Sequence, residues 1–479
     1  MYKRRRKSFL ALVLCLVLVA SVWGCGSESE NNVATETVET ETTMAENSNV
    51  KETEIQSETE PETESEVETK AEEVVETVES ETFEEEEEPE IEYFEAYPSL
   101  NEQALWSGFS MGTCMSYQNM GYSAYKDMCA WHFGSLSATN EMKAYSLLDQ
   151  AKSKKSPNGM PVMNYEKADE IVAFAQENGM GVRGHVLVWD ASMSDWFFRE
   201  GYNSNGAYVD KATMKARLQY YIEEVMTHFE EKFPGVVYCW DVVNEAVGDN
   251  ESDYAAGDAR HVRTLRSGKE NLFYKYVGED YVELSFLYAR NTVEKLQKKN
   301  PAVDIKLFYN DYSTFYDAKR DAICELLKSV NSYAKDDKGN YRKLCDGMGM
   351  QSYIGGYGKQ SGCMNSGDLA KVEKAIQIYA DLGLEVHVTE LAVRNYKDDE
   401  ETLKKHGEFY GKLFEIYKNA NADGKKVVTN VTIWGIQDNP YMETTEYSYR
   451  MSGPYCGLFD KSLCVKSAFR NVYEVLSEQ

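Results

Sequence analysis

The sequence is poor in the residues that build metal sites. It contains only six His, which stand singly along the chain, and its ten Cys form no CxxC pair. Because transition metals need several such ligands at close spacing, a metal-dependent enzyme is disfavoured. Cys456 and Cys464 are near enough in sequence to form a disulfide, and the sequence leaves that pairing open.

Positive charge is also scarce. Lys and Arg number 51 against 80 Asp and Glu, which gives a formal net charge of −29. Much of the excess lies between Gly26 and Glu95, where 27 Glu face two Lys. No basic stripe is present for phosphates, so nucleic acid is not expected as a partner. The acidic segment has too few apolar residues to offset the entropy of ordering, and we predict a disordered acidic linker over residues 26–96.

The first 25 residues have the organisation of a signal peptide. Five basic residues precede an apolar run of about a dozen residues, which is too short for a comfortable membrane span. Cys25 follows a small residue and resembles the acylated Cys of the bacterial lipobox. We therefore expect a lipoprotein-type signal over residues 1–25 and a lipid anchor at Cys25 that holds the protein at the cell surface. Secretion without a lipid is the alternative.

From residue 97 onward, apolar runs alternate with helical patterns. The runs predict strands at residues 105–112, 132–138, 181–189, 236–244, 304–311, 347–353, 385–391 and 431–437. The helical pattern is clearest over residues 165–179 and 281–300. Strands that are apolar throughout and alternate with helices are typical of a parallel sheet covered on both faces. Eight such units predict an α/β fold, a (β/α)8 TIM barrel over residues 97–479.

Two glutamates stand where strands of this barrel would end. Glu245 closes the fourth predicted strand and Glu390 closes the seventh. Active sites of such barrels lie at the carboxyl ends of the strands, so the two side chains would meet across the mouth. One glutamate at a strand end is often only a cap or an ion-pair partner. Two of them, with Trp, Asn, Gln and His at neighbouring strand ends, predict a catalytic pair.

The segments that carry these residues resemble the motifs of glycoside hydrolase family 10, the endo-β-1,4-xylanases. The matching segments are WDVVNEA (240–246), VHVTEL (386–391), TNEMK (139–143), RGHVLVW (183–189), LFYNDY (307–312), GMGMQS (347–352) and WGIQD (434–438). The resemblance implies a retaining, endo-acting hydrolase that cleaves β-1,4-xylan by double displacement. It implies Glu390 as nucleophile and Glu245 as acid/base, and no metal or organic cofactor.

The resemblance also implies which residues bind the sugar chain: Asn140, Lys143, His185, Trp189, Asn244, Gln351, Tyr353 and Trp434. Asn244 would bind the 2-hydroxyl of the sugar at the cleavage point, and His185 another hydroxyl of that sugar. The two Trp would stack on sugar rings, and Gln351 would hydrogen-bond around the nucleophile. Asn310 would support the site from behind. The partner is then a polysaccharide, and we expect a monomer.

Five positions depart from the family pattern. Thr139 and Asp190 stand where a sugar-binding Glu and a His are usual, and Met442 stands near the place of a second aromatic wall. Tyr353 and Ala392 replace a His and an Asp that flank the nucleophile in the family. Two alternatives therefore stay open: a β-glycanase with altered specificity, and a glycan-binding barrel without catalysis. The presence of both catalytic glutamates argues against the second.

Overall fold

The computed structural model describes residues 91–355, 364–439 and 453–478. The chain divides into two compact units, Met1–Glu85 and Glu86–Gln479, and the described residues belong to the second. The predicted signal peptide, Cys25 and the linker up to residue 90 lie outside the described residues, as does Met442. No helix among the described residues is long and apolar enough to cross a membrane.

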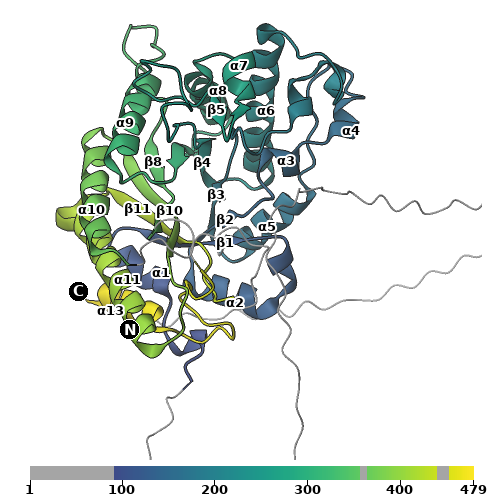
Figure 1. Cartoon of the computed structure of the whole chain (residues 1–479). Helices are drawn as coiled ribbons and strands as arrows, with labels where there is room; N and C mark the ends of the chain where they lie inside the picture. The colour runs from purple at the N-terminus through teal and green to yellow at the C-terminus, as the bar shows by residue number, and fades with distance from the viewer. Residues whose placement is uncertain (1–90, 356–363, 440–452, 479) are drawn as a thin grey trace, which may run out of the picture. The chain divides into compact units, whose positions relative to one another are not determined.

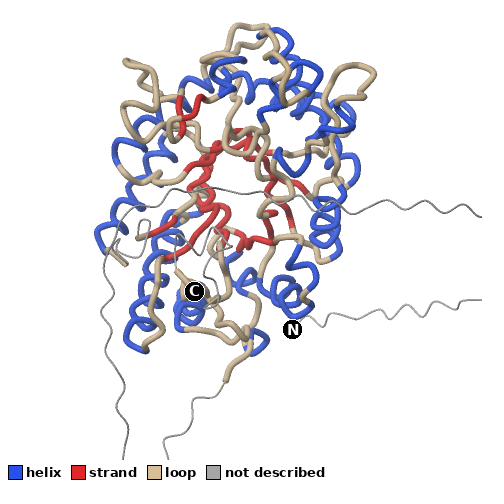
Figure 2. Tube along the Cα trace, turned by 45° about the vertical axis from the view of Figure 1, so that its right-hand side comes forward, coloured by secondary structure: helices blue, strands red, loops and turns tan. Residues whose placement is uncertain are grey.

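Eight parallel strands close into a barrel, seen as a ring inside the helices in Figure 2. These strands are β1 (Ser110–Met115), β2 (Ser135–Ala138), β3 (Gly181–Gly184), β4 (Val237–Asn244), β7 (Lys306–Asp311), β8 (Gly347–Met350), β10 (Glu385–Val393) and β11 (Val428–Ile433). Each pairs with the next in chain order, and β11 pairs with both β10 and β1, which closes the ring. The predicted (β/α)8 barrel is confirmed.

Helices surround this barrel (Figure 1). They are α1 (Leu100–Trp106), α2 (Ser123–His132), α3 (Ala144–Leu147), α4 (Gln150–Ser153), α5 (Glu166–Glu177), α6 (Lys211–Lys232), α7 (Leu272–Tyr276), α8 (Tyr281–Lys299), α9 (Asp317–Asn331), α10 (Ser366–Asp381), α11 (Glu400–Ala420) and α13 (Ser467–Ser477). Long helices bury one face, and side-chain caps mark several of their starts. In α6, the Asp210 carboxylate accepts the backbone N–H of Thr213, which satisfies one of the free donors of the first turn. The predicted helices at 165–179 and 281–300 correspond to α5 and α8.

Short elements complete the description. The 3-10 turns are η1 (Phe94–Ala96), η2 (Gln118–Gly121), η3 (Asp195–Phe198), η4 (Glu200–Tyr202) and η5 (Ala422–Gly424). Two further strands, β5 (Leu265–Arg266) and β6 (Lys269–Glu270), form an antiparallel hairpin between β4 and α7, and β9 (Tyr353–Ile354) pairs with β10.

The predicted strand at residues 105–112 is wrong in its first half. Leu105 and Trp106 end helix α1 and are 57% and 85% exposed, and the strand starts only at Ser110. An apolar run therefore did not mark a buried segment here. Burial depends on which residues the barrel covers, and the sequence does not contain that information locally.

The folded unit begins before residue 97, the predicted domain boundary. Phe94 is buried, and the His132 ring donates from Nε2 to the Phe94 carbonyl oxygen at 2.8 Å. Glu92 accepts a hydrogen bond from Arg470 at 2.9 Å. Residues 91–96 therefore belong to the folded unit, although the acidic composition before them conceals this in the sequence.

The possible Cys456–Cys464 disulfide does not form. Both residues are free thiols, Cys456 buried and Cys464 half-buried.

Candidate active site

The carboxyl ends of the barrel strands bring the two predicted catalytic glutamates into one hydrogen-bonded network. Glu245 follows the last residue of β4, and Glu390 lies in β10, the fourth and seventh strands of the barrel. Glu390 is only 7% exposed. Its Oε1 accepts from Asn310 Nδ2 at 3.2 Å, and its Oε2 accepts from the Tyr353 hydroxyl at 2.5 Å. Both bonds are donated to the carboxylate, which suits a nucleophile that must be ionised.

Burial raises the pKa of Glu390, because an ionised carboxylate loses hydration in the barrel. The nearby charge of Glu245 adds to the rise. His185, Tyr353 and Lys143 act in the opposite direction. The net effect is upward, so ionisation of the nucleophile is harder than for an exposed glutamate.

The orientation of the Asn310 amide follows from its neighbours. Its Oδ1 accepts the Thr389 hydroxyl at 2.7 Å, so its Nδ2 is the atom that donates to Glu390 and to Asn244 Oδ1, at 3.0 Å from the latter. The close approach requires a glycine on the adjacent strand, because a Cβ on Gly349 would lie 2.4 Å from Asn310 Oδ1. Asn310, expected to support the site from behind the residues that form it, is thus in direct contact with Glu390.

Asn244 and Gln351 carry the network on to Glu245. Asn244 Nδ2 donates to Glu245 Oε1 at 3.2 Å, and Gln351 Nε2 donates to Asn244 Oδ1 and Glu245 Oε1 at 3.2 and 3.1 Å. Gln351 was expected to hydrogen-bond around Glu390. In the structure its amide donates instead to Glu245 and to Asn244. Asn244 in turn accepts from the Asn310 amide that contacts Glu390.

The backbone of Glu245 adopts an unusual conformation. Its φ is +54°, in the left-handed region that residues with a Cβ rarely use. Its N–H donates to Asn310 O at 2.9 Å, and the next two N–H groups, of Ala246 and Val247, donate to the Tyr309 hydroxyl. These bonds hold the strained residue in place, and such strain is frequent where function dictates geometry.

A buried polar chain positions His185. Arg183 makes two hydrogen bonds to Asp241, at 2.8 and 2.6 Å, and Asp241 Oδ2 lies 2.9 Å from His185 Nδ1. Burial opposes ionisation of Asp241, but the Arg183 charge and the bonds from both partners lower its pKa to about 2. A permanently ionised Asp241 therefore fixes the His185 ring at the barrel mouth.

The expected sugar-binding residues that follow the neighbouring strand β2 also lie together. Asn140 Oδ1 accepts from Lys143 Nζ at 3.2 Å and from the Tyr145 hydroxyl at 2.6 Å. Lys143 Nζ lies 5.3 Å from the centre of the Trp189 ring. Burial lowers the pKa of Lys143, and the charges of Glu390 and Glu245 partly offset this. The arrangement offers an amide, an ammonium and an aromatic face to one ligand.

Tyr353 and Ala392 form a small apolar cluster with Trp434 and Cys114 beside the nucleophile. Ala392 and Tyr353 are partners in the β9–β10 register, and Ala392 is fully buried. The Tyr353 hydroxyl donates to Glu390, and Ala392 places no charged group beside it.

One residue of the site has no counterpart in the sequence analysis. Arg266, on the β5–β6 hairpin, makes ion pairs with Glu245 Oε2 at 2.9 Å and with Asp190 at 2.7 Å. Trp189 Nε1 donates to the same Glu245 oxygen at 3.2 Å. Ser267 and Gly268, with φ of +50° and +78°, form the tight hairpin turn. The Ser-Gly pair between Arg266 and Lys269 could have predicted the turn. It gives no indication that Arg266 contacts Glu245.

The site's chemistry is that of a carboxyl pair surrounded by N–H and O–H donors. No group of three or more His, Cys, Asp or Glu that could hold a metal ion occurs within the described residues. The expected site residues Asn140, Lys143, His185, Trp189, Asn244, Glu245, Asn310, Gln351, Tyr353, Glu390 and Trp434 all lie at or next to this mouth, on the ends of successive strands. Their roles toward a sugar stay predictions.

Comparison with known proteins gives a consistent result. A family model described as glycosyl hydrolase family 10 matches residues 99–475. A putative endo-1,4-β-xylanase of Caldicellulosiruptor saccharolyticus is 36% identical over 305 residues, which cover 62% of this chain and 87% of that protein. Endo-1,4-β-xylanase B of Butyrivibrio fibrisolvens is 33% identical over 69% of this chain, but the match spans only 46% of that protein.

Solved structures show the same fold. The CBM22-1–GH10 modules of Clostridium thermocellum endo-1,4-β-D-xylanase 10B, complexed with xylohexaose, superpose with a TM-score of 0.64 and 28% identity. That match covers 78% of this chain and 67% of the other. The chain spans less than half the length of several curated relatives, among them endo-1,4-β-xylanase A of Thermotoga maritima, of which it covers 31%.

Proposed function

The chain belongs to glycosyl hydrolase family 10, and we propose that it is a retaining endo-β-1,4-xylanase. The observation that carries the proposal is the pair Glu245 and Glu390 on opposite barrel strands, joined through the amides of Asn310, Asn244 and Gln351. Retaining glycosidases need such a pair, with one carboxylate ionised and the other able to carry a proton.

In the first step, a Glu390 oxygen attacks the anomeric carbon while the bond from that carbon to the glycosidic oxygen breaks. The proton of Glu245 moves to the departing oxygen, and a glycosyl ester on Glu390 remains. Asn244 would bind the 2-hydroxyl of the same sugar, because it lies between the two glutamates. A bond to that hydroxyl strengthens as positive charge develops on the ring.

In the second step, water attacks the anomeric carbon and Glu245 takes its proton. The ester bond to Glu390 breaks, and the product leaves with the configuration of the substrate. Once Glu390 is esterified its negative charge is gone, which favours the ionised form of Glu245 as base.

A related β-glycan is the second candidate substrate. Thr139 stands where family members usually have a sugar-binding Glu, and Arg266 paired with Asp190 occupies the space beside the acid/base. Both changes alter what a sugar would meet outside the cleavage point. The purified full-length chain should therefore be assayed on xylan, arabinoxylan, mixed-linkage glucan, cellulose and mannan, with analysis of the products. Release of xylo-oligosaccharides from xylan supports the proposal, and activity confined to another glycan would replace it.

Two variants test the assigned roles. Glu390→Ala and Glu245→Ala should each lower turnover by several orders of magnitude, roughly 10³-fold or more, and leave the fold intact. Azide should restore turnover of an activated aryl xyloside in both, with opposite anomers of the glycosyl azide in the two. Substantial residual activity in either variant would remove that residue from its role.

We also propose that the enzyme is a monomer held at the cell surface by a lipid on Cys25. Support comes from the sequence of the first 25 residues, in which a basic segment and a short apolar run precede that Cys. A polymeric substrate that stays outside the cell fits this location.

A further inference from the structure

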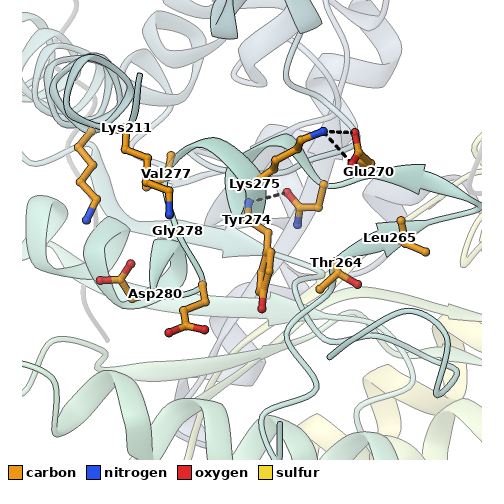
Figure 3. Close-up of a pocket in the computed structure, with 12 residues that line it drawn as sticks. Lys211, Thr264, Leu265, Glu270, Tyr274, Lys275, Val277, Gly278 and Asp280 are labelled. Atoms are coloured by element: carbon orange, nitrogen blue, oxygen red, sulfur yellow. Dashed lines mark hydrogen bonds and ion pairs between the residues drawn. The ribbon is translucent and has the colours of Figure 1, made fainter. Parts of the chain in front are cut away.

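The β5–β6 hairpin, which lies between β4 and α7 in the chain, brings an arginine to the proposed acid/base. The β5–β6 hairpin is anchored at its base, where Lys275 of α7 forms an ion pair with Glu270 at 2.6 Å (Figure 3). The next residue, Asn271, caps α7 by accepting the N–H groups of Phe273 and Tyr274. Hairpin and helix together line a cavity of about 770 Å³. Arg266 is therefore presented by a hairpin that is tied to a capped helix.

The guanidinium of Arg266 has most of its donors engaged. Nε and Nη2 bind the two oxygens of Asp190, at 2.8 and 2.7 Å. Nη2 also donates to the Glu245 carbonyl oxygen at 2.8 Å, and Nη1 donates to Glu245 Oε2 at 2.9 Å. These contacts use four of the five N–H groups of an arginine. The residue therefore acts on Glu245 and has little capacity left for an anionic ligand.

The carboxyl group of Glu245 is surrounded by donors alone. Oε2 accepts from Arg266 and Trp189, and Oε1 accepts from Asn244 and Gln351. These four bonds fix the orientation of the carboxyl group, and the bond from Arg266 is charge-assisted.

We propose that the Asp190–Arg266 pair is a positioning device that orients the Glu245 carboxyl group toward the leaving oxygen. The proposal rests on the xylanase reaction described above. Asp190 holds the guanidinium through two hydrogen bonds, so that Nη1 reaches Glu245 Oε2. Loss of either residue should therefore impair protonation of the leaving group, and loss of Arg266 should impair it more.

Other charges near Glu245 come from every wall of the mouth. Glu390 on β10 and Asp311 at the end of β7 are negative and interact with it electrostatically. Lys143, after β2, is positive, and Arg263 approaches its carbonyl oxygen at 3.4 Å. Within the part of the chain that the structure describes, Arg266 makes the ion pair with the Glu245 side chain. Arg266 is therefore the residue to replace.

The test compares kcat/KM on two substrates, xylohexaose and a 4-nitrophenyl β-xylobioside, for the full-length chain and three variants. The nitrophenolate leaving group needs little protonation, so only cleavage of xylohexaose depends strongly on a well-placed general acid. Arg266→Met should lose at least about tenfold more activity on xylohexaose than on the aryl substrate, and Asp190→Asn should show the same preference to a smaller extent. Lys269→Met removes a positive charge from the position paired with Arg266 in the hairpin and should leave the ratio of the two activities unchanged.

A further variant separates charge from orientation. Arg266→Lys keeps the charge but loses the two-pronged contact. Its kcat on xylohexaose should therefore fall as in Arg266→Met, with little change on the aryl substrate.

The outcomes distinguish the two proposals. A wild-type protein that cleaves neither substrate defeats the proposed function itself. A wild-type enzyme that is active, with Arg266→Met losing the same factor on both substrates or on neither, overturns the positioning role alone. If thermal melting shows that Arg266→Met does not fold, the ratio of the two activities in Asp190→Asn and Arg266→Lys is the deciding measurement. A ratio equal to that of the wild type in both variants overturns the role.

Discussion

Tyr353 and Ala392 occupy facing positions on β9 and β10 beside the nucleophile, where the family usually has a His and an Asp. Loss of the His alone would leave a buried unpaired carboxylate next to Glu390, which costs about 3–5 kcal/mol. With Ala392 fully buried and the Tyr353 hydroxyl bonded to Glu390, the site avoids that charge. With both the His and the Asp absent, no unpaired charge is left beside Glu390.

Reversal of the pair gives a prediction. Ala392→Asp alone should lower kcat/KM strongly and move the acid limb of its pH profile upward, because the new charge hinders ionisation of Glu390. Tyr353→His alone should be tolerated better, and the double variant should recover much of the loss. The measurement is kcat/KM against pH for the wild type, both single variants and the double. Additive effects would show that the two positions are not coupled.

Glu390 also gives a prediction about stability. Its pKa is raised in the folded state by burial, so its ionised form opposes folding above the unfolded-state value of 4.5. Glu390→Gln should therefore increase the free energy of unfolding at pH 7.5 by about 1.4 kcal/mol for each unit of the pKa rise. The melting temperature should rise accordingly. The gain should shrink as pH falls through the folded-state pKa and vanish below the unfolded one.

Thermal melts at pH 4 and pH 7.5 measure this effect. Glu415→Gln, which changes an exposed side chain of α11, is the matched control and should leave the melting temperature unchanged. If the Glu390→Gln protein is less stable than the wild type at pH 7.5, the buried carboxylate does not destabilise the folded state.

Among the secondary-structure elements, the barrel strands could be predicted from the sequence and the β5–β6 hairpin could not. Each predicted strand overlaps an observed one, because a barrel strand is buried on both faces and reads as an apolar run. The strand ends were predicted less accurately, since the runs at 181–189 and 431–437 continue beyond Gly184 and Ile433. Glu245 does follow the last residue of β4, whereas Glu390 lies within β10. The β5–β6 hairpin was missed, since Arg266 meets Asp190 only through folding, 76 positions away in the chain.

Residues 91–96 should contribute to the stability of the barrel. The buried Phe94 ring and the bond between His132 and the Phe94 carbonyl tie this segment to the barrel. Burial of a Phe side chain is worth about 1.5–3 kcal/mol. Deletion of residues 26–96 should therefore lower the melting temperature, whereas deletion of residues 26–85 should not, and Phe94→Ala in the intact chain should reproduce the loss. Equal melting temperatures for the two deletions would mean that the segment contributes nothing to the fold.

At the scale of the whole molecule, the proposed anchor and the barrel make separable contributions. We expect the full-length protein to partition with membranes, and Cys25→Ser to release it or to block its maturation. Deletion of residues 26–85 should leave turnover on short xylo-oligosaccharides unchanged, since the acidic segment is not expected to contact the barrel. Membrane fractionation of cells that express each form measures the first effect. Soluble wild-type protein in the absence of detergent would exclude the anchor.

If Glu245 and Glu390 form the carboxyl pair of a retaining xylanase, the first product keeps the β-configuration of the substrate. Proton NMR during hydrolysis of xylohexaose by the full-length protein should show the β-anomer of the new reducing end first, with the α-anomer appearing only as the sugar mutarotates. The same signal should be absent in Glu390→Ala. Appearance of the α-anomer first would contradict the claim, as would undiminished hydrolysis by the Glu390→Ala protein.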